Sequence, residues 1–185
     1  MKDYQEKLHF LTEIFISKIA SILSLKNFEF EFGFASEFQP YASMSLDVPG
    51  VMLSPDDIMK INTNIKVPEE RFNFVPTVVI NDYFKFNDEL ELLGIIAHEL
   101  RHVWQYHNVY GAKDLLKQHI TPNTKKYYDS KLEMDAYAFQ MVVLKTIYPT
   151  ITIKEVFENF KGINSSIRRI ERQYKLLINE EFKEF

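Results

Sequence analysis

The stretch DELELLGIIAHELRHVW, residues 88–104, is the part of the sequence that decides the fold. Asp88 stands three residues before Glu91, which is the spacing of a capping box, so a helix is expected to begin at about Asp88. The helix is predicted to be amphipathic, because apolar residues recur at helical spacing at Leu90, Leu93, Ala97, Leu100 and Trp104.

The same helix carries the pattern HExxH, His98-Glu99-Leu100-Arg101-His102. Residues four apart lie one turn apart on the same face of a helix, so both imidazoles can reach a single metal ion. Glu99 lies beside them and is suited to take a proton from water that the ion activates. The pattern therefore predicts a catalytic metal site with His98 and His102 as ligands and Glu99 as general base.

The composition limits which metal sites this chain can build. Its 185 residues include no cysteine and five histidines, four of which lie between residues 98 and 119. Thiolate zinc fingers, iron–sulfur clusters and cysteine nucleophiles are thereby excluded. Any metal must be bound by His, Asp and Glu, and a catalytic zinc usually has three protein ligands and one open position.

The residues just after the motif do not supply an obvious third ligand. A metzincin would carry Gly at position 105 and His at position 108, where this chain has Gln105 and Asn108. His107 points roughly 140° away from His102 around the helix, and His119 falls in a predicted loop; both stay open as candidates. Arg101 is expected either to pair with an acid behind the ligands or to be solvated.

A second helix, predicted from about Ser130 to Tyr148, offers the better candidates. It carries the run Glu133-Met134-Asp135-Ala136. HExxH followed by Glu-x-x-Ala on a downstream helix resembles the gluzincin metallopeptidases, including the small prokaryotic and phage peptidases of ImmA/IrrE type. The resemblance covers about residues 77–147.

That resemblance implies a zincin-like fold in which Glu133 is the third ligand to Zn²⁺ and Ala136 keeps the helix crossing close. Larger gluzincins often carry Asp after this Ala, but here the position is Tyr137. Asp135 stays open, either in place of that Asp or as the ligand itself. Glu133 also has another reading, because Ser130-x-x-Glu133 matches a capping box.

A peptidase also needs a group that stabilises the oxyanion of the tetrahedral intermediate. Tyr137 is the preferred candidate, because it lies one turn from Glu133 on the same helical face. The alternatives near it in sequence are Tyr127, Tyr128, His107 and His119.

The rest of the chain mixes helical and extended patterns. Amphipathic helices are expected at residues 4–25, from Thr152, and over the C-terminal segment, which is expected to pack on the domain. Alternation predicts antiparallel strands at 28–34 and 42–48, the first with a buried face of phenylalanines, and a β-branched run predicts a strand at 77–82. We therefore expect one α+β domain over residues 1–185, with a small sheet that is mainly antiparallel or mixed, the two active-site helices and a helical C-terminal region.

These features together predict a zinc-dependent peptidase acting on a peptide or protein, which a sheet edge, such as the strand at 77–82, could hold by backbone pairing. The alternative is an inactive binding or regulatory module of the same fold, or a peptidase dedicated to one regulatory protein. A formal net charge of −4 argues against a nucleic-acid partner. No apolar run is long enough to cross a membrane, and the charged N-terminal residues do not resemble a signal peptide, so the expected location is cytoplasmic.

Overall fold

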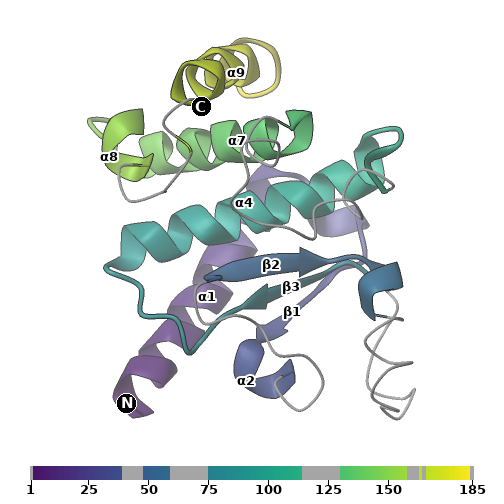
Figure 1. Cartoon of the computed structure of the whole chain (residues 1–185), viewed down its shortest axis with the longest axis vertical. Coiled ribbons are helices and arrows are strands. Elements are labelled where there is room, and N and C mark those ends of the chain that lie inside the picture. Colours follow the sequence, from purple (N-terminus) through teal and green to yellow (C-terminus); the bar gives the residue numbers. More distant parts are fainter. Residues whose placement is uncertain are drawn as a thin grey trace.

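The computed structural model describes residues 2–38, 48–58, 75–113, 130–157, 163 and 166–183. Within these ranges the fold is α+β, as predicted (Figure 1). Its elements in chain order are α1 (Lys2–Ile22), η1 (Leu25–Asn27), β1 (Glu31–Phe34), α2 (Ala35–Phe38), β2 (Gly50–Leu53), β3 (Thr77–Ile80), α4 (Glu89–Asn108), α7 (Lys131–Ile147), α8 (Ile153–Phe157) and α9 (Ile167–Glu180).

The sheet has three short strands in the order β1-β3-β2. β1 runs parallel to β3, whereas β2 runs antiparallel to it, and Ile80 of β3 lies between Phe34 and Gly50. The sheet is therefore mixed, which was one of the two arrangements expected, with one parallel and one antiparallel pair of strands. The physical reason is that the chain from 35 to 76 is long enough to return β3 alongside β1 in the same direction.

One further strand prediction stays untested, and another needs correction. The strand predicted at 42–48 lies outside the described residues except for Val48, so its pairing with residues 28–34 is not tested. Among the described strands, β1 pairs with β3. The strand at 77–80 is central and not an edge; among the described strands the edges are β1 and β2.

The phenylalanine alternation at residues 28–34 is only partly buried. Phe34 is buried and stacks on His9 of α1, with ring centroids 3.6 Å apart. Phe28 and Phe30 are partly buried against the core. Phe32 keeps 39% of its surface exposed, although it shares the face of Phe34, so the prediction of a fully buried stripe is wrong at that position.

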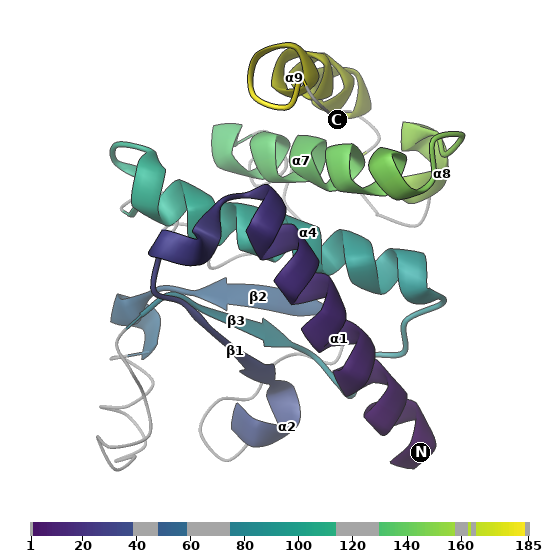
Figure 2. The ribbon, with the colours of Figure 1, turned by 180° about the vertical axis from the view of Figure 1, so that it is seen from behind.

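Helix α4 lies against the sheet and forms the centre of the molecule. It contacts β2 and β3, and α1 crosses both the sheet and α4 (Figure 2). Val78 and Ile80 of the central strand share one buried core with Ile96 and Leu100 of α4. The predicted start of this helix is confirmed, because the Asp88 side chain accepts a hydrogen bond of 2.8 Å from the Glu91 amide.

Helix α7 packs on α4, and α9 packs on α7, so that helices and sheet form successive layers (Figure 1). Ser130 caps α7, and the helix ends at Ile147, just before Pro149. The amphipathic C-terminal helix packs on the domain as expected, with Ile170 and Leu177 buried. Among the helices that the structure describes, none is long and apolar enough to cross a membrane.

Candidate metal centre

Three side chains from α4 and α7 meet in the layer between these helices. His98 and His102 of α4 approach each other with their Nε2 atoms 3.1 Å apart. The Glu133 carboxylate of α7 lies 3.2 Å from His98 Nε2 and 3.3 Å from His102 Nε2. All three side chains are buried, and among the described residues they are the only group of His, Asp and Glu that is close enough to hold a metal ion.

The spacing and chemistry of these atoms fit a tetrahedral metal. Ligands about 2.05 Å from a tetrahedral zinc lie about 3.3 Å from one another. The two imidazole nitrogens are 3.1 Å apart, and each lies 3.2 to 3.3 Å from a different oxygen of Glu133, Oε2 for His98 and Oε1 for His102. Glu133 Oε2 is buried without a hydrogen-bond partner, and His98 Nε2, which lies 3.2 Å from it, is itself a candidate ligand atom. A cation between these atoms would satisfy them, because a buried carboxylate oxygen is costly when it is left alone.

Gln105 fixes the orientation of His102. Its Nε2 donates to the carbonyl of Leu132 at 2.9 Å and to Asp135 Oδ2 at 2.8 Å, so both amide protons face acceptors. Its Oε1 therefore accepts from His102 Nδ1, 2.8 Å away. With the proton on Nδ1, the lone pair of His102 is on Nε2, which faces His98 and Glu133.

Asp135 is bound to Arg101 and does not join the group around Glu133. Arg101 is buried, and its Nε lies 2.8 Å from Asp135 Oδ2, while its Nη1 lies 2.6 Å from Glu181 Oε1. The guanidinium also covers the Trp104 ring at 3.9 Å. Arg101 thus pairs with acids behind the candidate ligands, which was one of the two expectations for it, and joins α4 to α7 and to the end of α9.

Glu99 lies beside the group without being part of it. It is buried, and its carboxylate accepts a hydrogen bond from the backbone of Met52 on strand β2. Gly50 on the same strand makes this approach possible: a Cβ there would lie 2.8 Å from Ile95 Cγ2 and 3.5 Å from Glu99 Cγ. Burial raises the pKa of Glu99 above its ordinary value, against the opposing effect of the two imidazoles.

In the absence of a metal, the charges of His102 and Glu133 strongly shift each other's pKa. Burial alone would lower the pKa of His102, but the Glu133 carboxylate raises it to about 9. Burial alone would raise the pKa of Glu133, but the two imidazoles hold it well below its usual range. A proton on His102 therefore substitutes for some of the positive charge that a metal would bring.

The remaining candidate residues lie in different surroundings. Tyr137 is buried, with its ring 4.3 Å from that of His98 and 5.4 Å from that of Phe157. His107 stacks on Phe28 at 4.7 Å and is not part of the metal group. His119, Tyr127 and Tyr128 lie outside the described residues.

Of the capping box predicted at Ser130 and Glu133, the structure shows the Ser130 half, whereas the Glu133 side chain belongs to the metal group. Ser130 Oγ accepts a hydrogen bond of 3.2 Å from the Glu133 amide, as a helix cap would, while the Glu133 carboxylate faces the imidazoles. The role of Gln105 was missed, although it lies seven residues after His98 and hence on the same face. The contact of Met52 and Gly50 with Glu99 has no local signal in the sequence, because it depends on how β2 meets α4.

Comparisons with models of known protein families, with curated proteins and with solved structures find no match for this chain.

Proposed function

We propose that this chain is a zinc-dependent peptidase, with His98, His102 and Glu133 as the metal ligands. The observation that carries the proposal is a buried two-histidine, one-carboxylate group with a further buried carboxylate, Glu99, next to it. Nitrogen and carboxylate ligands of this kind suit zinc, and three protein ligands leave a position open, as in catalytic zinc sites. A bound zinc ion would lower the pKa of water and polarise a peptide carbonyl.

Glu99 is the general base in this proposal. Its carboxylate takes a proton from the attacking water as the new carbon–oxygen bond forms. It then delivers that proton to the amide nitrogen as the carbon–nitrogen bond breaks. A raised pKa suits both steps, because a carboxylate that ionises nearer neutral pH can accept and return a proton.

Strand β2 is the edge at which we propose that the peptide binds. It is one of the two edge strands described, and its Met52 contacts Glu99 directly. A peptide added to this edge by backbone hydrogen bonds would pass close to the general base. This replaces the expectation that the strand at 77–82 offers the edge.

Tyr137 is proposed to stabilise the oxyanion. Support comes from its ring contact with His98 and its position one turn from Glu133. Tyr137→Phe removes the hydroxyl and keeps the packing. It is expected to lower kcat by about 100- to 1,000-fold, as for the loss of one oxyanion donor, with zinc content unchanged.

The proposal is tested by metal content and hydrolysis together. Purified protein should contain about one zinc per chain, and His102→Ala should lose it. Glu99→Gln should keep zinc and lose hydrolysis of a casein-type substrate or peptide library, because an amide cannot accept the proton. Glu89→Gln, an exposed change on the same helix, is the matched control. Normal cleavage by Glu99→Gln, or zinc retained in full by His102→Ala, would refute the assignment.

A further inference from the structure

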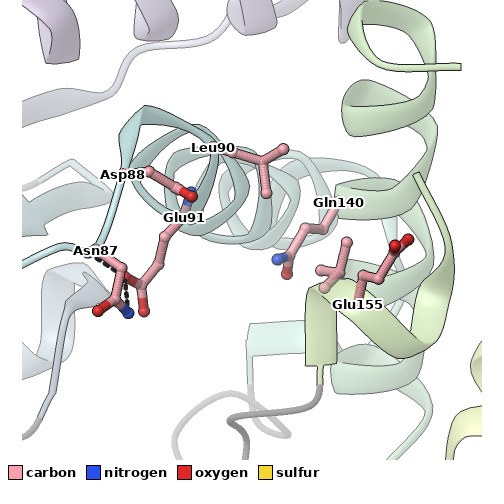
Figure 3. Close-up of a pocket in the computed structure, with 7 residues that line it drawn as sticks. Asn87, Asp88, Leu90, Glu91, Gln140 and Glu155 are labelled. Carbon is pink, nitrogen blue, oxygen red and sulfur yellow. Dashed lines mark hydrogen bonds between the residues drawn. The ribbon is translucent and has the colours of Figure 1, made fainter. Parts of the chain in front are cut away.

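A surface pocket lies at the start of α4, where α7 and α8 meet it. Its volume is about 90 Å³, and we call it the α4–α8 pocket. Figure 3 shows Asn87 and Glu91 on one side of the opening and Gln140 and Glu155 on the other. The pocket is lined by Asn87, Asp88, Leu90, Glu91, Gln140, Glu155 and Val156.

Gln140 is the unusual residue of this pocket. Its side chain is 98% buried, because only 2% of its surface is exposed, and Oε1 has no hydrogen-bond partner. Gly94 makes room for it: a Cβ there would lie 2.6 Å from Gln140 Nε2. A buried amide oxygen without a donor is costly, so this acceptor indicates a ligand that brings hydrogen-bond donors.

Glu91 and Glu155 of the pocket each use one carboxylate oxygen for a hydrogen bond within the protein. Glu91 Oε2 accepts from Asn87, and Glu155 Oε2 accepts from Thr152, which leaves the second oxygen of each carboxylate for a ligand. The hydrogen bonds from Thr152 hold the pKa of Glu155 below its ordinary value, so this carboxylate stays charged. The neighbouring cation, Lys145, donates to the carbonyl of Ile151 at 2.7 Å.

The distances between the acceptors of the pocket favour an organic cation over a metal ion. Within the described residues, the carboxylates of the pocket do not come close enough together to form a metal-binding group. A cation with several spread donors can still reach separate acceptors, as guanidinium and ammonium groups do. Leu90 and Val156 supply apolar surface on which the aliphatic part of a lysine or arginine can lie.

The pocket and the metal group both lie along the interface between α4 and α7. Gln140, Tyr137 and Glu133 follow one face of α7, and Glu91, Gly94 and His98 follow the facing side of α4. Gln140 is seven residues from Glu133, or about 10 Å along the helix. About three extended residues span that distance.

We infer that the α4–α8 pocket binds the ammonium or guanidinium group of a basic side chain, with Glu91, Glu155 and Gln140 as acceptors. This inference rests on the proposed peptidase function for its substrate: a peptide with lysine or arginine within about three residues of the cleaved bond.

The test has a binding arm that does not depend on hydrolysis. N-acetyl-lysine methylamide and its norleucine counterpart are titrated into the zinc-loaded protein and followed by NMR. The lysine probe is expected to bind about tenfold tighter or more, because charged hydrogen bonds are lost in the norleucine probe. This preference should vanish in Gln140→Leu and in the double variant Glu91→Gln/Glu155→Gln. It should persist in Glu89→Gln, whose carboxylate pairs with Lys7.

A second arm measures cleavage of matched peptides with lysine or norleucine at each position near the cleaved bond. We expect kcat/KM to favour lysine about tenfold at one position, and the preference to fall to about one in the double variant. Equal binding of the two probes would overturn the pocket inference alone. A lysine preference in binding, with no peptide hydrolysed, would keep the pocket and overturn the proposed peptidase.

Discussion

Replacing Gln105 tests whether residues that contact the candidate ligands tune the proposed metal site. Gln105 is fully buried and makes three hydrogen bonds of 2.8 to 2.9 Å, to His102, Leu132 and Asp135. Gln105→Leu keeps a similar volume and removes all three. His102 then loses the acceptor that holds its proton on Nδ1, so its metal-binding nitrogen is less well oriented.

Two separate costs are expected from this change. Loss of such a partner behind a metal ligand weakens zinc binding by about 10- to 100-fold, or about 1.4 to 2.7 kcal/mol. The Leu132 carbonyl and the Asp135 carboxylate also each lose a donor, and together these losses lower the free energy of unfolding of the metal-free protein by about 1 to 3 kcal/mol. Gln105→Glu should separate the two costs. It keeps an acceptor for His102, so zinc binding is retained, but it places a carboxylate beside Asp135 and destabilises the fold.

Zinc affinity can be measured by competition with a chromogenic chelator, and stability by urea unfolding with the metal removed. Asn108→Ala is the control, because Asn108 makes an exposed hydrogen bond to the Trp104 carbonyl on the same helix. The reasoning is refuted if Gln105→Leu binds zinc within twofold of the unmodified protein. It is also refuted if Gln105→Glu binds zinc as weakly as Gln105→Leu.

Two other predictions concern buried charge. Arg101→Met should lower the free energy of unfolding by about 3 kcal/mol, because it leaves two partly buried carboxylates without their cation. The exposed Arg172→Met should change it by less than about 0.5 kcal/mol. A loss below about 1 kcal/mol for Arg101→Met in urea unfolding would contradict this. Metal-free protein should lose stability as the pH rises from 6.5 through 9. The reason is that the pKa of His102 is about 9 in the folded protein, above its ordinary value of 6.5. The proton on His102 therefore stabilises the folded state, and this stabilisation is lost as the proton leaves. A urea midpoint that is flat over this range in chelator would contradict it, and His102→Asn should reduce the slope.

The parts that could be predicted from the sequence are those set by local spacing. The start of α4 at Asp88 and the common face of His98 and His102 follow from helical periodicity alone. Glu133 came from a resemblance to a family pattern, and the structure brings it to the two histidines.

The parts that could not be predicted depend on distant pairing. The parallel pairing of β1 with β3 requires knowing where the chain returns, which local alternation does not encode. The contact of Met52 with Glu99 likewise depends on the sheet meeting α4. Asp135 could not be separated from Glu133 by spacing, because only the position of Arg101 and Glu181 decides which acid is engaged elsewhere.

Gly94 has a consequence for how α4 and α7 find their alignment. Two antiparallel helices with apolar faces can slide past each other by a turn, about 5.4 Å, and still bury much of the same surface. A slip of one turn here would place Leu90 or His98 under Gln140 where Gly94 now leaves room for its amide. It would also take the Leu132 carbonyl from Gln105. The interface between α4 and α7 therefore favours one register, the register in which Glu133 lies beside both imidazoles.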